Sequence, residues 1–322
     1  MSGTLEQRAS RCAQALAADA DVRAVLLTGS VALGLAGPDS DVDLLVLHAA
    51  KGGEINAPQI ESACFDGRRF DVETIQWRTA HQMLASAAGD LQFLRERGRL
   101  TSAIILFDRS GEFSKARTEA RVACLDAAES KRFAKSIEFW ADQAGAASAS
   151  PFAVFCLQQL ADLACVCVTS ASSIGFVKPK WMLARLRQIG RGDLADLICH
   201  LHGCGTVSAE GAQDVLDTTR EWLTPAIEAC QSEEVKDYIL RTFEDAGSLS
   251  KLQSYDAAVY VAHMSVRMML AEQRDRVDSL ANALPLLVSD DAAKDFDASA
   301  RVQVVTQDLV STVAATLRPH QL

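Results

Sequence analysis

Short apolar runs alternate with helical spacings along the first third of the chain. Apolar residues from Leu5 to Ala17 recur at intervals of three and four, which predicts an amphipathic helix. Four short segments are rich in β-branched residues or alternate between apolar and polar positions, so we expect strands at residues 22–28, 42–47, 69–77 and 103–107. Helical spacing returns over residues 79–96. The pattern predicts a small α/β domain with a mixed sheet.

Beyond Phe113 the strand patterns stop. The later segments with a regular pattern all have helical spacing, at residues 127–144, 151–169, 178–189, 193–202, 209–222 and onwards, 254–277 and 298–317. We therefore expect an all-α helical bundle to follow the α/β domain, with residues 1–115 forming the first domain and residues 116–322 the second.

Composition supports two folded domains and limits the class of partner. The chain has 322 residues, of which 49% are hydrophobic, enough for two domains with real cores. Its formal net charge of −10 argues against binding of duplex nucleic acid, because neutralising phosphates requires a basic surface. The first 115 residues hold 12 basic and 15 acidic residues, and the remainder 20 and 27. The more acidic helical half would suit a cationic ligand.

Three further features bear on the cellular setting. The N-terminal segment lacks an apolar stretch after a positive start, so we expect no signal peptide and a cytoplasmic protein. The most apolar segment, Phe152 to Val168, is interrupted by Gln158, Gln159 and Asp162, and predicts a buried core helix and no membrane span. The nine cysteines form no CxxC pair, which indicates free and mostly buried thiols.

Candidate chemistry is concentrated between residues 27 and 77. A predicted strand delivers Gly29 and Ser30 to the start of a short helix, where backbone N–H groups and a hydroxyl can hold phosphate oxygens. The next strand opens with Asp41 and Asp43, whose spacing of two puts both carboxylates on one face, as a Mg²⁺ site requires.

The third predicted strand offers two more carboxylates on one face, Asp71 and Glu73. Carboxylates that share Mg²⁺ ions can neutralise a triphosphate and activate a hydroxyl in line with its α-phosphate. A Gly-Ser turn followed by a DxD strand and a further acidic strand is much more specific than a lone DxD. The pattern predicts transfer of a nucleotidyl group.

These residues resemble the nucleotidyltransferase superfamily that includes DNA polymerase beta, and within it the aminoglycoside nucleotidyltransferase-like branch. The likeness rests on Gly29-Ser30, Gly34 and the segment from Ser40 to Leu44, which match the pattern of GS, a spacer and SDxDL. It implies that Gly29 and Ser30 bind the nucleotide phosphates and that Asp41, Asp43 and Asp71 ligate Mg²⁺.

The same resemblance leaves the third strand with two assignments. Asp71 and Glu73 both qualify as metal ligand and as base for the acceptor hydroxyl, so Asp41, Asp43, Asp71 and Glu73 together are the candidate catalytic residues. In the helical half, the Lys-Trp stretch around Lys180 resembles a segment from which a lysine reaches the triphosphate in several such enzymes.

The function implied is that of a Mg²⁺-dependent enzyme of the EC 2.7.7 type. It would move an NMP, AMP first, from ATP or another NTP to a hydroxyl of a small molecule, such as an aminoglycoside-like compound, and release pyrophosphate. Two alternatives stay open, which are nucleotidylation of a protein or a tRNA and a non-catalytic nucleotide-binding module. Exposed faces of helical bundles often pair, so a homodimer is also open.

Overall fold

The computed structural model describes residues 4–37, 40–49, 59–65, 68–86, 88–120, 124–147, 150–172, 178–272, 283–288, 290–296 and 299–317. The chain forms two compact units. The first contains residues 1–130 and 170–176, and the second contains residues 131–169 and 177–322. The predicted domain boundary at residues 115 and 116 stays a prediction, because a domain is defined by independent folding and not by contacts alone.

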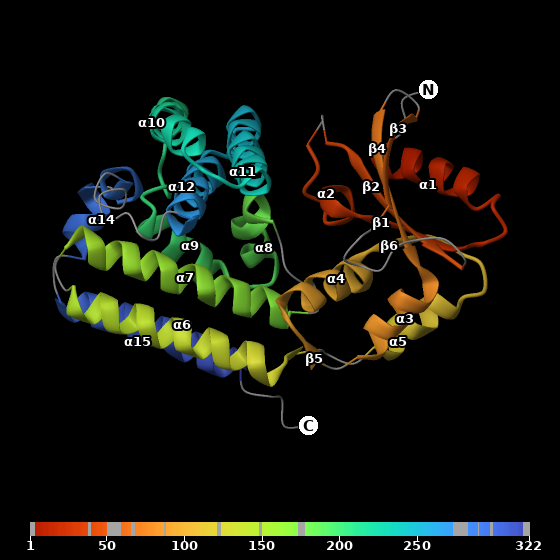
Figure 1. The fold of residues 1–322 in the computed structure, drawn as a ribbon, viewed down its shortest axis with the longest axis horizontal. Coiled ribbons are helices and arrows are strands. Elements are labelled where there is room, and N and C mark those ends of the chain that lie inside the picture. The colour runs from red at the N-terminus through yellow and green to blue at the C-terminus, as the bar shows by residue number, and fades with distance from the viewer. Residues whose placement is uncertain are drawn as a thin grey trace. The chain divides into compact units, whose positions relative to one another are not determined.

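The first unit is built on a five-stranded mixed sheet (Figure 1). Its strands run in the order β3-β4-β2-β1-β6. Their bounds are β1 Val22–Thr28, β2 Val42–His48, β3 Gln59–Phe65, β4 Arg68–Gln76 and β6 Ile104–Asp108. Strands β2 and β4 pair parallel, whereas β1 pairs antiparallel with both β2 and β6, and β3 pairs antiparallel with β4. The small mixed sheet predicted from the sequence is confirmed, with β3 as a strand that the apolar pattern did not reveal.

Both faces of this sheet are covered by helices. On one face, α1 (Leu5–Leu16) and α2 (Gly29–Ala32) pack on a buried cluster that includes Leu27, Leu44 and Phe70. On the other face, α3 (Trp77–Ala85), α4 (Leu91–Ser102) and α5 (Glu112–Glu119) cover a cluster that includes Leu45 and Ile75. Because successive strand residues point to opposite faces, each strand contributes alternate side chains to the two clusters.

The helix predicted over residues 79–96 was wrong, because the structure contains two helices there. The short strand β5 (Ala88–Gly89) lies between α3 and α4 and pairs parallel with β7 (Cys124–Leu125). Asp90 then caps α4, since its Oδ1 accepts a hydrogen bond of 2.7 Å from the Phe93 N–H. Apolar spacing continues across this break in phase, so periodicity alone did not reveal the new helix start.

The described elements of the second unit are all helical, as predicted (Figure 1). They include α6 Ala127–Ala146, which begins in the first unit, α7 Pro151–Ala171, which ends in the first unit, the 3-10 helix η1 Pro179–Trp181, α8 Met182–Gln188, α9 Gly192–Leu201, α10 Ala209–Glu228, α11 Glu233–Lys251, α12 Tyr255–Glu272, α14 Asp290–Asp295 and α15 Ser299–Leu317. Residues 283–287 are helical as well. Helix α12 packs against α10 and α11. The predicted helix over 254–277 matches α12 up to Glu272, and its last five residues lie outside the described residues.

Helix α7 is the most apolar of the long helices in the described residues. Among the described residues, it is the helix that is long and apolar enough to cross a membrane, but 72% of its apolar window is buried inside the protein. The buried Gln158 donates hydrogen bonds from its side chain to the carbonyl oxygens of Leu201 and Leu287, at 2.9 and 2.6 Å. These contacts fix α7 among its neighbours and confirm the prediction of a core helix.

Candidate functional site

The strand pairing brings two of the predicted carboxylates next to each other. Asp43 on β2 and Asp71 on β4 are register partners in a parallel ladder. Paired residues of adjacent strands point to the same face of a sheet, about 5 Å apart. Two carboxylates at that separation can ligate a common divalent cation. The sequence placed these residues on separate strands, and the register of β2 with β4 is what joins them.

Gly29 lies against Asp43. It has a φ of +66°, and a Cβ at this position would be 1.9 Å from Oδ2 of Asp43. A glycine is therefore required here for two reasons, the left-handed backbone and the close approach of the carboxylate. The next residue, Ser30, is buried, and the chain turns after α2, where the Leu35 N–H donates to the Ser30 carbonyl oxygen at 2.9 Å. The Gly-Ser turn thus meets the end of β2 that carries Asp43.

Asp41 precedes Asp43 in the sequence, and Asp71 lies beside Asp43 on the neighbouring strand. Asp41 is partly buried and lies directly before β2, two residues ahead of Asp43. The side chain of Asp71 is 23% exposed and contacts Arg69, with 3.1 Å between Nε and Oδ1. Arg69 is 63% exposed, so solvent screens its ion pair with Asp71 and the contact contributes little free energy.

Glu73 is held differently from Asp71. It lies two residues further along the same face of β4, and its carboxylate accepts from Arg99 of α4 at 2.6 Å. Arg99 also donates to Glu96 at 2.6 Å. Burial opposes the charge on the guanidinium, but the hydrogen bonds and charges of the two glutamates raise the pKa of Arg99. Glu73 is only 15% exposed, so its carboxylate serves to anchor α4 on the sheet.

Lys180 belongs to the second unit. It lies in η1, and its Nζ donates to Oδ1 of Asp245 on α11 at 2.7 Å. The same ammonium lies 5.6 Å from the centre of the Trp181 ring. Both contacts are local to the helical unit, and a role for Lys180 at a triphosphate stays a prediction.

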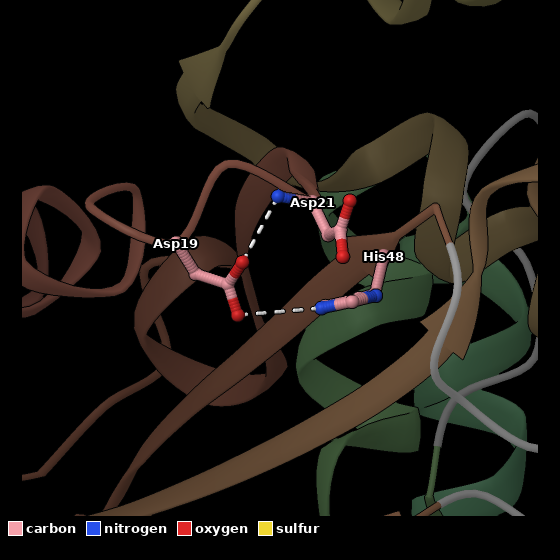
Figure 2. A group of neighbouring side chains, drawn as sticks. All are labelled: Asp19, Asp21 and His48. Atoms are coloured by element: carbon pink, nitrogen blue, oxygen red, sulfur yellow. Dashed lines mark hydrogen bonds and ion pairs between the residues drawn. The ribbon is translucent and has the colours of Figure 1, made fainter.

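A further cluster of ligand-type side chains lies at the opposite end of β2, and the sequence analysis missed it. Asp19 and Asp21 precede β1, and His48 ends β2, with one donor atom from each within 4.8 Å of the others (Figure 2). The antiparallel register pairs Val22 with His48, which brings the histidine to the loop before β1. Deducing that hairpin pairing from the two strands would have revealed the cluster.

Comparison with known proteins identifies part of the chain. Residues 9–80 match the model of the nucleotidyltransferase domain family. The N-terminal unit contains a nucleotidyltransferase domain. None of the curated proteins compared with the chain matches it. A solved structure of a nucleotidyltransferase-like protein from Exiguobacterium sibiricum 255-15 aligns over 99% of this chain and 96% of that one, at 10% identity and a TM-score of 0.28. A TM-score that low carries no argument about the fold.

The nucleotidyltransferase domain match has consequences for the site residues. It spans α1 to the start of α3 and so includes the Gly-Ser turn, all four candidate carboxylates and the cluster at the other end of β2. Lys180 lies outside it. The match supports transfer of a nucleotidyl group in general and gives neither the acceptor nor the branch of the superfamily.

Proposed function

We propose that this protein transfers an NMP, AMP first, from a Mg²⁺-bound NTP to a hydroxyl of a small molecule and releases pyrophosphate. The observation that carries the proposal is the parallel register of Asp43 with Asp71, next to a glycine turn that leaves no room for a side chain. The nucleotidyltransferase domain match over the same residues supports it.

The donor set suits a hard cation. Carboxylate oxygens come from Asp41 and Asp43 at the start of β2 and from Asp71, the residue of β4 that pairs with Asp43. Oxygen donors of this kind are the ones that Mg²⁺ prefers. When bound, Mg²⁺ neutralises charge on the triphosphate and favours attack at its α-phosphate. The three aspartates would hold it, and Asp71 would exchange its contact with exposed Arg69 for the metal.

The residues of the chain divide the remaining tasks. Gly29 lets the backbone approach the phosphates, and the N–H groups at the start of α2 with the Ser30 hydroxyl would bind their oxygens. We assign Glu73 a positioning role, because Arg99 occupies its carboxylate and ties it to α4. Asp71 is then the residue of β4 that can also accept the proton of the acceptor hydroxyl, since it is more exposed than Glu73 and its ion pair with Arg69 lies at the surface.

The acceptor is proposed as a hydroxylated, cationic small molecule such as an aminoglycoside-like compound. The net charge of −10 and the excess of acidic over basic residues in the second half favour a cationic ligand. ATP is the first NTP to test.

The experiment uses the full chain with Mg²⁺, each of four α-labelled NTPs and a bacterial extract to which aminoglycosides are added. We expect label in a new small-molecule species with the wild type, and none with the Asp41→Asn/Asp43→Asn variant. Asp90→Asn is a matched control, because an asparagine caps α4 as the aspartate does and the substitution removes one carboxylate from the same unit.

Each other outcome has a defined meaning. Label in protein or RNA that depends on Asp41 and Asp43 would keep the enzyme class and replace the acceptor. Label that persists in the Asp41→Asn/Asp43→Asn variant would refute the site. Binding of Mg²⁺-NTP with no label in any fraction would instead favour a nucleotide-binding module.

A further inference from the structure

The loop before β1 and the end of β2 hold a mixed set of metal-binding side chains outside the site described above. Asp19 and Asp21 supply carboxylates and His48 supplies an imidazole, with one donor atom from each within 4.8 Å of the others. Figure 2 shows the three side chains converging from two segments that the antiparallel pairing of β1 with β2 brings together. We propose that this cluster is a second metal site, which binds a Zn²⁺-type divalent ion.

The position of His48 supports the proposal. Its side chain is 5% exposed, and its Nε2 is directed at Oδ2 of Asp19, 3.4 Å away. That distance is long for a hydrogen bond between a ring nitrogen and a carboxylate. It fits two ligands of one tetrahedral ion, because metal bonds of about 2.0–2.1 Å place neighbouring ligand atoms about 3.3 Å apart. The buried ring is held in place, while Asp19 is 48% exposed and leaves a path for the ion to enter from solvent.

The loop that carries the two aspartates is ordered by its own hydrogen bonds. Oδ1 of Asp19 accepts from the Asp21 N–H at 2.9 Å, which leaves Oδ2 directed at His48. The guanidinium of Arg109 donates to the backbone carbonyl oxygens of Ala17, Asp19 and Val22, at 2.7, 2.9 and 2.9 Å. These bonds hold the backbone in the shape that presents the carboxylates. Such preorganisation reduces the cost of ordering the ligands when an ion binds.

Charge and donor chemistry indicate the kind of ion. The two carboxylates bring negative charge to the cluster, which favours a cation. An imidazole ligand favours Zn²⁺ over Mg²⁺ or Ca²⁺, which prefer all-oxygen sites. His48 is five residues from Asp43 along β2, about 17 Å for an extended strand, so this ion would be distinct from one held by Asp41, Asp43 and Asp71.

The test measures Zn²⁺ binding to the full chain by equilibrium dialysis under reducing conditions, together with the Tm in the presence of Zn²⁺. We expect the wild type to bind one more equivalent of Zn²⁺ than Asp19→Asn or Asp21→Asn, and to gain several degrees in Tm that these variants do not gain. Asp19→Asn keeps an oxygen that can accept from the Asp21 N–H, so the turn is preserved while the anionic ligand is lost. Loss of a ligand should weaken binding at least about tenfold.

Three controls keep the result specific. Asp90→Asn and Asp41→Asn/Asp43→Asn should both retain the extra equivalent, and the latter also separates this proposal from the proposed nucleotidyl transfer. His48→Gln should lose the equivalent. Equal Zn²⁺ binding by the wild type and Asp19→Asn, loss of the equivalent with Asp41→Asn/Asp43→Asn, or displacement of Zn²⁺ by an equal concentration of Mg²⁺ would each overturn the proposal.

Discussion

The close approach of Gly29 to Asp43 yields a prediction with an internal control. Gly29 and Gly34 both have a left-handed φ, at +66° and +68°. An alanine at either position pays the strain of a left-handed residue, roughly 1–2 kcal/mol. Their surroundings differ, since a Cβ at Gly29 would be 1.9 Å from Oδ2 of Asp43 and one at Gly34 would meet nothing within 4 Å. The pair therefore separates backbone strain from displacement of the carboxylate.

The expected magnitudes follow from that difference. Gly34→Ala should lower the free energy of unfolding by the strain alone. Gly29→Ala should lose about 1 kcal/mol more, the cost of driving the Asp43 side chain off its rotamer. A ligand displaced by about 1 Å costs on the order of 100-fold in rate, so Gly29→Ala should lose at least that much nucleotidyl transfer while Gly34→Ala stays within a few-fold of the wild type.

The assay pairs urea unfolding with equilibrium dialysis of α-labelled ATP in the presence of Mg²⁺, and with label transfer once an acceptor is found. All measurements are made at a temperature where both variants are folded. Equal Mg²⁺-ATP binding and equal transfer by Gly29→Ala and Gly34→Ala would refute the reasoning, because the two variants then differ in no property that depends on Asp43.

Three further predictions concern the packing around the site and the helical unit. Burial, with the charge of Arg267, lowers the pKa of His263 to about 4, below the value of about 6.5 expected in the unfolded chain. Between these two values the unfolded chain binds a proton that the folded protein does not, so the free energy of unfolding is unaffected by His263 above pH 6.5 and decreases as the pH falls towards 4. Urea unfolding should show a loss of about 2 kcal/mol from this residue between pH 7.5 and pH 5, and a His263→Gln variant with an undiminished loss would contradict the assignment. Replacing Arg99 by methionine should remove the ion pair that ties Glu73 to α4. A double-mutant cycle of Arg99→Met with Glu73→Gln, measured by unfolding, should give a coupling energy of about 1–2 kcal/mol. A coupling energy near zero would exclude the anchoring role of Glu73. Asp162→Asn should destabilise the protein by about 3–5 kcal/mol, because it leaves the guanidinium of Arg267 buried without its anionic partner. In thermal unfolding, the additional change Arg267→Met should recover part of that loss. Further destabilisation by Arg267→Met would argue against the ion pair.

Local sequence patterns determined much of the first unit. The apolar runs at 22–28 and 42–47 became β1 and β2 with bounds shifted by at most one residue, because buried strands need continuous apolar positions. The glycine turn and the DxD segment are each local, so their types and spacing could be read directly. Alternation along β4 correctly placed Asp71 and Glu73 on one face.

What distinguishes Asp71 from Glu73 was decided by tertiary structure. Both residues share one pattern, yet one faces Asp43 across a parallel ladder and the other is paired with an arginine 26 residues away. The break between α3 and α4, which helps to place Arg99, was also not revealed by the apolar periodicity of the sequence.

The second cluster was decided in the same way. Asp19 and His48 are 29 residues apart and meet because β1 and β2 pair antiparallel. Periodicity reports which face a side chain takes, since that depends on its own backbone. Which distant side chain it meets depends on strand order and register, which are set by the packing of the whole unit. The sequence by itself therefore determined the strands and their acidic residues, and the tertiary structure decided which of those residues share a site.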